Sequence, residues 1–330
     1  MGQRPGPGLN RCGVRNTKIM GCIFCGKSAP SKFLQVCVEC ARSERAFEVA
    51  EKLHPKKGGI VKTCKLCANE CKGIALCGKP IYGNLIYYED PLPTNCCNSW
   101  FCKGSSMFGT NLAVFYYGCN FDCLFCQNWS HKKVNRNFVT LEELLKAVEA
   151  ERVKCICHFG GSPEPQLPFA LRFSREALKR REDLMICWEW NGAGNTSLAI
   201  KAAELSSISG GTVKFDLKAW SEPLHVLLTG RGSERVRKNF EKIGEKFPEV
   251  LSATTLLVPY YVDEKEVEGI AGFIASVSED IPYSLLVFHP DYLLRDLPVT
   301  PRDQVLKCYK AAKKWLRNVN LGNLHLLGSL

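Results

Sequence analysis

From residue 111 onward, short apolar runs alternate with amphipathic stretches, and this alternation constrains the possible folds more than any other feature of the sequence. Strands that alternate with helices typically form a parallel sheet with the helices packed against it. Seven strands are predicted, at 111–118, 153–161, 184–192, 212–220, 251–260, 283–290 and 318–327. Helices are predicted at 140–152, 167–182, 195–208, 233–247, 263–278 and 301–317. We therefore expect an α/β domain over residues 111–330.

The carboxyl ends of the predicted strands carry the residues of most chemical interest. No G-x-G-x-x-G follows the first strand, which weighs against a dinucleotide-binding fold and favours a barrel or partial barrel. In barrels, active-site residues lie at the carboxyl ends of the strands. Polar residues and glycines recur at these ends, namely Cys119, Gly160, Gly161, Glu189, Asn191, Asp216, Lys218, His289 and Asn323. This coincidence predicts an active site at that edge of the sheet.

The loop after the first predicted strand reads GCNFDCLFCQNW and places Cys119, Cys123 and Cys126 in the spacing C-x3-C-x2-C. A structural zinc site almost always takes four ligands, so a set of three suggests a metal that keeps one position open. Three thiolates from one short loop are suited to three corners of a [4Fe–4S] cluster, which leaves the fourth iron for a ligand that is not protein.

A separate four-cysteine site is predicted near the N-terminus. Cys22 with Cys25 and Cys37 with Cys40 form two C-x-x-C knuckles, and paired knuckles at this separation are typical of tetrahedral zinc. We expect a zinc-ribbon-like module over residues 21–58, closed by a helix at 41–54 and dependent on its metal for folding. Residues 1–20 are rich in glycine, proline and arginine and are expected to form a flexible tail.

A second cysteine-rich segment is expected over residues 59–110. Its spacing C-x2-C-x3-C-x5-C suits either zinc or a second iron–sulfur cluster, since both use four thiolates. The four cysteines are Cys64, Cys67, Cys71 and Cys77. Three more cysteines follow, to which the sequence assigns no role: Cys96, Cys97 and Cys102. Because the thiols are grouped in a long chain without a secretory signal, metal ligation is a better interpretation of the 19 cysteines than disulfides.

Composition places the chain among ordinary globular proteins, with 45% hydrophobic and 23% charged residues. No run of 18 apolar residues predicts a membrane helix, so we expect no membrane partner and a cytoplasmic location. The formal net charge of +11 suits a nucleic-acid or acidic partner. A scattered basic surface explains the same charge, since no run of five basic residues occurs.

The three-cysteine motif, with Phe125 before its last cysteine, resembles that of the radical S-adenosylmethionine (SAM) superfamily. The chain looks closest to the pyruvate formate-lyase activating-enzyme-like branch, because GCNFDCLFCQNW, FGGSPEPQ, WEWNG, KFDLKAW, FHPDY and LGN occur in the order of that branch. The resemblance covers roughly 64–327 and implies a partial (β/α)6-type barrel, preceded here by the zinc module. It also implies that SAM binds the open iron of the cluster and is cleaved reductively to methionine and a 5′-deoxyadenosyl radical.

The resemblance extends to residues that would bind SAM. Gly160, Gly161 and Pro163 match the G-G-E-P segment that receives the amino group of SAM. Ser162 stands where that segment has glutamate, so backbone carbonyls instead of a carboxylate are expected to bind the amino group.

Two further segments that resemble the family lie at the carboxyl ends of later predicted strands. Asp216 and Lys218 match a D-L-K segment and lie on one face, because side chains alternate along a strand. The resemblance implies that Lys218 pairs with the SAM carboxylate and that Asp216 orients it or holds a cation; a surface ion pair is the simpler alternative. Glu189 and Asn191 match a D-T-N-G-like segment in which Trp190 replaces a small residue. His289 is expected to line the pocket.

The predicted function is that of an oxygen-sensitive radical SAM enzyme, an oxidoreductase or lyase, that abstracts hydrogen from an unidentified substrate. One form of this activity is the activation of a partner protein, and another is the radical modification of a nucleic acid or small molecule. A non-catalytic zinc-ribbon protein that binds nucleic acid is the alternative from another class. An enzyme of this kind also requires a low-potential electron donor, of flavodoxin or ferredoxin type.

Overall fold

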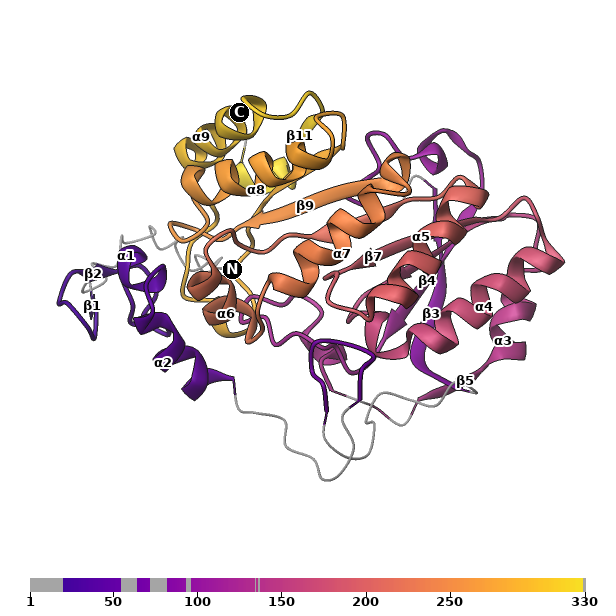
Figure 1. The fold of residues 1–330 in the computed structure, drawn as a ribbon, viewed down its shortest axis with the longest axis horizontal. Coiled ribbons are helices and arrows are strands. Elements are labelled where there is room, and N and C mark those ends of the chain that lie inside the picture. Colours follow the sequence, from indigo (N-terminus) through magenta and orange to yellow (C-terminus); the bar gives the residue numbers. More distant parts are fainter. Residues whose placement is uncertain are drawn as a thin grey trace, which may run out of the picture.

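A computed structural model describes residues 20–54, 64–71, 82–92, 96–133, 135 and 137–328 of the chain. Its main feature is a nine-stranded sheet in the order β11-β10-β9-β8-β7-β6-β4-β3-β5 (Figure 1). The strands are β3 (Tyr82–Pro91), β4 (Thr110–Tyr116), β5 (Phe138–Thr140), β6 (Val153–Phe159), β7 (Met185–Trp190), β8 (Val213–Asp216), β9 (Leu251–Leu257), β10 (Tyr283–Val287) and β11 (Val319–Gly322).

The seven predicted strands are confirmed, and they form the run from β4 to β11 in which every neighbouring pair is parallel. Register brings their carboxyl ends together, as in the pairs Phe115 with Phe159 and Trp190 with Phe215. This mixed α/β sheet matches the expected partial barrel, and the loops after these strands share one edge.

All six predicted helices of the domain form, and Figure 1 shows α4, α5 and α7 lying along one face of the sheet. Thr140 and Glu143 make the expected capping box at the start of α3. One helix was not predicted: α6 follows the D-L-K loop directly and is capped at its carboxyl end by Gly230, which has a φ of 70°. The domain helices are α3 (Leu141–Ala147), α4 (Leu167–Arg180), α5 (Thr196–Ser209), α6 (Glu222–Thr229), α7 (Glu234–Gly244), α8 (Glu264–Val277) and α9 (Arg302–Lys313).

Two strands at one end of the sheet were also not predicted. β3 pairs antiparallel with β4, and β5 pairs antiparallel with β3. β3 reads YGNLIYYEDP, in which polar residues interrupt the apolar pattern, and β5 has only three residues. These strands extend the sheet beyond β4, the strand that leads into the cysteine loop.

The N-terminal module is docked on the domain beside α6, at one end of the molecule in Figure 1. It contains β1 (Met20–Gly21), β2 (Ser28–Ala29), α1 (Val38–Ala41) and α2 (Arg45–Leu53). Leu34 and Val36 are buried in the same core as the domain. Tyr261 donates a hydrogen bond from its hydroxyl to the Val36 carbonyl at 2.8 Å, and Arg42 pairs with Asp263 at 2.5 Å. Polar and apolar contacts therefore both join the module to the domain.

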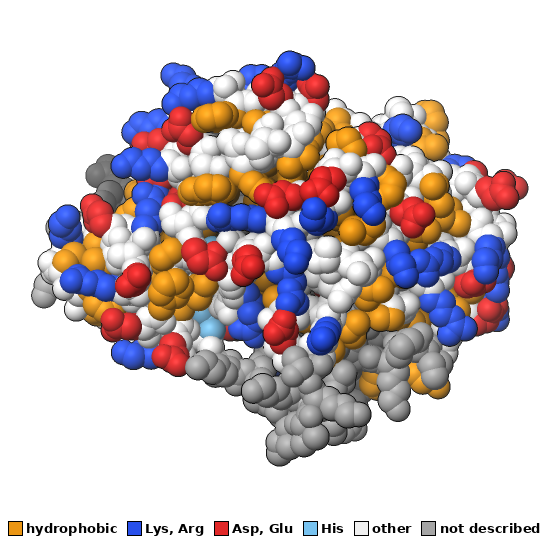
Figure 2. Space-filling model, viewed as in Figure 1, with side chains coloured by type: hydrophobic (Ala, Val, Ile, Leu, Met, Phe, Trp, Pro, Cys, Tyr) orange, Lys and Arg blue, Asp and Glu red, His pale blue; other side chains and the backbone are white. Residues whose placement is uncertain are grey.

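The surface charge is mixed on the face seen in Figure 2, where lysine and arginine are interspersed with aspartate and glutamate. This view agrees better with a scattered basic surface than with one concentrated basic patch. No helix in the described part of the chain combines the length and the apolar character needed to cross a membrane.

Candidate functional site

The cysteine loop (residues 119–126) follows β4 at the carboxyl edge of the sheet and is held against the end of α6. The amide of Asp122 donates to the Thr229 carbonyl at 2.8 Å, and that of Leu124 donates to the Leu228 carbonyl at 3.0 Å. Three apolar side chains between the cysteines are almost fully buried and anchor the loop: Phe121, Leu124 and Phe125. Apolar anchoring and backbone bonding thus fix a loop that presents three thiols.

The three thiols of this loop lie in a dry environment next to cations. Burial raises the pKa of Cys119 well above its usual range and that of Cys123 to about 12. Lys218 and Lys132 lie close enough to Cys123 to oppose this rise. Positive charges beside buried thiols favour the thiolate form, which is the form that binds metal. The donor set therefore fits a metal centre with thiolate ligands.

Gly160 and Gly161 form a cradle beside the end of β4. Their φ angles are 61° and 56°, in the region that favours glycine. A Cβ on Gly160 would lie 2.0 Å from the Phe115 ring, and one on Gly161 would lie 1.9 Å from the Tyr116 carbonyl oxygen. Only a residue without a side chain allows this close approach. The buried Nε2 of His131, whose Cβ lies near Gly161, has no hydrogen-bond partner among the described residues.

Asn191 connects the end of β7 to the cysteine loop. Its Nδ2 donates to Asn120 Oδ1 at 2.6 Å and to Ser162 Oγ at 2.9 Å, and lies 3.9 Å from Cys119 Sγ. Ser162 in turn donates to Glu164. The structure thus brings together the residues expected near the cluster from two different strands.

Glu164 is a site residue that sequence reasoning missed. The substitution of Ser162 in the G-G-E-P segment suggested that no carboxylate would lie here, yet Glu164, two residues later in FGGSPEPQ, is completely buried. Its Oε1 accepts a hydrogen bond from the Gly192 amide at 2.7 Å. Burial raises its pKa to about 7. Glu164 can be read in the sequence of this segment, but only the folded structure shows that its carboxylate accepts a hydrogen bond from Ser162.

Asp216 and Lys218 form the expected pair on one face, with Lys218 Nζ 2.7 Å from Asp216 Oδ2. Burial alone would lower the pKa of Lys218, but the Asp216 carboxylate raises it above its usual value. The ammonium group also lies 5.8 Å from the centre of the Phe125 ring, next to the last cysteine of the loop. Lys218 is therefore a fixed positive charge beside the cysteine loop.

Three other residues predicted to bind SAM lie in three different environments: Pro163, Glu189 and His289. Pro163 is buried next to the glycine pair. Glu189 turns toward the sheet interior, where its carboxylate lies 2.6 Å from Lys214 Nζ and 2.8 Å from Cys96 Sγ. His289 is exposed, and no hydrogen bond to it is found within the described ranges. Within the described residues, Asn191 makes hydrogen bonds to the cysteine loop, and none is found for Glu189 or His289.

A buried ion-pair network behind the cysteine loop was also missed. Asp122 accepts from Lys132 Nζ at 2.5 Å and is 2.9 Å from His54 Nδ1. Burial would raise the pKa of Asp122, but these two partners bring it down to about 2. His54 Nε2 lies 2.9 Å from the Leu227 carbonyl. Because His54 follows α2, this network links the N-terminal module to the loop; no local sequence pattern indicates it.

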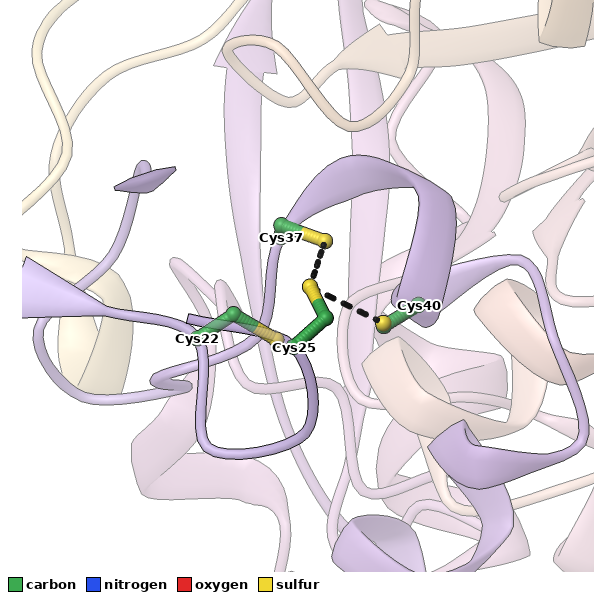
Figure 3. A group of neighbouring side chains, drawn as sticks. All are labelled: Cys22, Cys25, Cys37 and Cys40. Carbon is green, nitrogen blue, oxygen red and sulfur yellow. Dashed lines mark hydrogen bonds between the residues drawn. The ribbon is translucent and has the colours of Figure 1, made fainter. Parts of the chain in front are cut away.

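The four cysteines predicted to bind zinc are gathered in the N-terminal module, and Figure 3 shows their side chains converging. Cys25 Sγ lies 3.6 Å from Cys37 Sγ and 3.7 Å from Cys40 Sγ, and all four sulfurs are within 4.8 Å of one another. A tetrahedral zinc with Zn–S bonds of about 2.3 Å separates its sulfurs by about 3.8 Å. The predicted ligand set, with Cys22 included, therefore fits one zinc ion.

The second cysteine group packs beside the end of β7. The Cys64 amide donates to the Cys71 carbonyl at 2.8 Å, and Cys67 forms a β-bridge with Gly194. Cys77, the fourth member of the predicted set, lies outside the described residues. Zinc and an iron–sulfur cluster both remain predictions for this group.

Comparisons with known proteins show what the chain resembles. The family model described as the radical SAM superfamily matches residues 113–274, which include the cysteine loop, the glycine pair and Lys218. A protein of Methanocaldococcus jannaschii, provisionally named a glycyl-radical enzyme activating enzyme, is 27% identical over 216 residues, which are 63% of this chain and 79% of that protein. An isethionate sulfite-lyase activating enzyme of Desulfovibrio desulfuricans is 33% identical over 132 residues, 39% of this chain and 40% of that enzyme. A crystallised domain of a pyruvate-formate lyase-activating enzyme from Bacteroides vulgatus is 14% identical, covers 51% of this chain and 98% of that domain, and has a TM-score of 0.42.

Proposed function

We propose that this chain, whose residues 113–274 match the radical SAM superfamily model, is an activating enzyme that creates a radical on a partner protein. Its cofactors are a [4Fe–4S] cluster, held by Cys119, Cys123 and Cys126, and SAM. When bound, they supply the reductive cleavage of SAM to methionine and a 5′-deoxyadenosyl radical, which abstracts a hydrogen atom. A low-potential donor of flavodoxin or ferredoxin type provides the electron.

The observation that carries this proposal is the setting of the cysteine loop. Three thiols from one loop lie at the carboxyl edge of a parallel sheet, beside a glycine cradle on β6 and a fixed ammonium group after β8. A fourth cysteine of the same loop is lacking. A cluster bound here would keep one iron for SAM, which is the property that the proposed chemistry needs.

The residues around the loop have separate proposed roles in binding SAM. Lys218 pairs with the carboxylate of SAM, and Asp216 holds the Lys218 ammonium group in position. Gly160, Gly161 and Pro163 form the segment whose backbone receives the amino group. In a partly dry site, an ammonium–carboxylate hydrogen bond contributes about 1.5–3 kcal/mol to binding.

Three further residues have supporting roles in the proposal. Asn191, in contact with Cys119, orients the first cluster ligand and bounds the SAM site. Glu189 points toward Cys96, so we assign contact with SAM to Asn191 in preference to Glu189. His289, exposed after β10, lines the rim of the pocket.

A protein partner is favoured over a nucleic acid or a small molecule. The names of two relatives, from M. jannaschii and D. desulfuricans, refer to enzymes that activate other enzymes. An aromatic pair also lies beside the cysteine loop: Trp129, with about half its surface exposed, stacks on Tyr292 with ring centres 5.9 Å apart. Exposed aromatic side chains are enriched where proteins dock, and this pair is well placed for a partner approaching the SAM site.

The test is an anaerobic assay of the reconstituted protein with SAM and a strong reductant. We expect 5′-deoxyadenosine and methionine in equal amounts and, after addition of a candidate partner, a glycyl-radical enzyme, an electron paramagnetic resonance signal on that partner. A protein with a full cluster that forms no 5′-deoxyadenosine contradicts the proposal. Cleavage of SAM without a radical on the partner rejects protein activation and favours the nucleic-acid or small-molecule alternative.

A further inference from the structure

A short segment before β4, residues 96–102, lies across the inner face of the sheet. Asn98 Nδ2 donates to Ser252 Oγ on β9 at 3.0 Å, and the hydroxyl of Ser284 on β10 donates to the Cys97 carbonyl at 2.9 Å. Trp100 Nε1 donates to the same Ser284 hydroxyl at 2.9 Å. This inner segment is therefore fixed to two strands that are distant from it in sequence.

Glu189 faces the inner segment and not the helices. On β7 the side chain of Trp188 points to the helical layer, where its Nε1 donates to the Ala202 carbonyl of α5 at 3.0 Å. Side chains alternate along a strand, so Glu189 projects from the opposite face. There its Oε1 lies 2.8 Å from Cys96 Sγ and 3.4 Å from Cys157 Sγ.

From this arrangement we infer a metal site to which the sequence assigned no role: Cys96, Cys97 and Glu189 bind one zinc ion on the inner face of the sheet, with the fourth position left to water or a substrate donor. The two sulfurs and a carboxylate oxygen all lie within 4.8 Å of one another. Zinc accepts both thiolate and carboxylate ligands, and sites with three protein ligands leave a fourth position open. A single ion would join the inner segment to β7.

The surrounding charges favour an ion of charge +2. Lys214 Nζ lies 2.6 Å from Glu189 Oε2 and 3.6 Å from Asp216 Oδ1, and Lys218 pairs with Asp216. With the thiols protonated, two carboxylates therefore balance two ammonium groups. Zinc that displaces one proton each from Cys96 and Cys97 leaves this balance unchanged, so binding adds no net charge to a buried site, where charge is costly.

Lys214 also orients the Glu189 carboxylate for metal binding. By holding Oε2, the Lys214 ammonium group fixes the carboxylate so that Oε1 is directed toward the thiols. Thr254 Oγ1 lies 3.2 Å from Cys97 Sγ and restrains that thiol in the same way. Such outer contacts commonly orient metal ligands. The site shares no ligand with the cysteine loop: Glu189 lies on β7, roughly 7 Å before Asn191, which follows the end of that strand.

The first test measures zinc and iron per chain in the full-length protein, in the Cys96→Ser/Cys97→Ser double variant and in Cys308→Ala. Cys308 is a matched control, because it is a fully buried thiol on α9, away from all of these ligands. The double variant should contain about one zinc less than the wild type, with iron unchanged, while Cys308→Ala matches the wild type. A double variant with the zinc content of the control overturns the inference.

The double variant could lose both zinc and iron because it misfolds. A second variant then tests whether the site binds zinc. Glu189→Gln keeps both thiols and the side-chain shape and removes only the anionic ligand. We measure the zinc that it retains after dialysis against a graded series of a zinc chelator. One ion should be released at a chelator concentration at least about 10-fold lower than from the wild type. Identical release curves overturn the inference.

Discussion

Single residues around the cysteine loop are held in place by charges that are balanced locally. Lys218 pairs with Asp216, Lys132 pairs with Asp122, and both ammonium groups lie near Cys123. Each cation is therefore fixed by a carboxylate before any ligand binds. A group that is already positioned loses little conformational entropy when it meets a ligand, which favours tight and specific binding.

Replacement of Lys218 tests its proposed role toward SAM. Lys218→Ala should weaken SAM binding by roughly 10- to 150-fold, since a charge-assisted hydrogen bond of about 1.5–3 kcal/mol is lost. Iron content should stay unchanged. Isothermal titration of the cluster-loaded protein with SAM gives the affinity, and Lys201→Ala, an exposed lysine on α5, is the control. An affinity within about twofold of wild type would leave Lys218 as one half of a structural ion pair.

Glu164 predicts a dependence of stability on pH. Burial raises its pKa to about 7 in the folded protein, whereas an unfolded glutamate titrates near about 4.3. Between these values the folded protein holds a proton that the unfolded chain releases, so stability decreases as the pH rises from about 4.5 to about 7.

The side chain in the Glu164→Gln variant does not titrate. The variant should therefore lose less stability than wild type over the same pH range. Denaturant midpoints measured from pH 5 to pH 8 give the comparison, with Glu204→Gln, an exposed glutamate on α5, as the control. If the wild type and Glu164→Gln have parallel profiles, then Glu164 does not titrate as its burial predicts.

Among the elements, those with a local signature were predicted and those made by tertiary contacts were not. The seven parallel strands and the six predicted helices follow hydrophobic periodicity, which is local. β3 and β5 depend on antiparallel pairing beside β4, and α6 is a short helix whose end supports the cysteine loop. The same division applies to the site: C-x3-C-x2-C is a local spacing, whereas Glu164, His54 and the contact of Cys96 with Glu189 require the folded chain.

The close approach of the β6 loop to β4 gives a prediction at this scale. A side chain at Gly161 would meet the Tyr116 carbonyl oxygen at 1.9 Å, so Gly161→Ala must push the loop away from the cysteine loop. Both melting temperature and bound iron should decrease. Gly328→Ala is a matched control, because Gly328 has a φ of 73° but open space around it. If the two variants behave alike, backbone strain alone explains the effect and the cradle has no role in holding the cluster.

At the scale of the whole molecule, the N-terminal module supports the α/β domain that carries the cysteine loop. His54 at the end of α2 reaches Asp122 within the cysteine loop, and Arg42 pairs with Asp263 before α8. The helix predicted at 41–54 was expected to close the module, and its last residue, His54, is buried in the contact between the two parts. The N-terminal module and the cysteine loop are therefore physically connected.

This connection predicts that His54→Ala weakens iron retention although His54 binds no iron. The substitution removes one of the two partners of the partly buried Asp122 carboxylate, so the loop should open more often and release iron faster to a chelator. The rate of iron loss from anaerobic protein measures this effect, with the exposed His325→Ala as the control. Equal rates in the two variants would mean that the module is only attached to the domain and does not stabilise its loop.

The central claim is that Cys119, Cys123 and Cys126 hold the [4Fe–4S] cluster at which SAM is cleaved. Iron and zinc per chain, measured after anaerobic reconstitution of the variant with all three cysteines changed to alanine, test it most directly. We predict a loss of about four irons per chain relative to wild type, with zinc unchanged, because the predicted zinc ligands lie elsewhere. Iron content equal to that of wild type in the triple variant would contradict the claim.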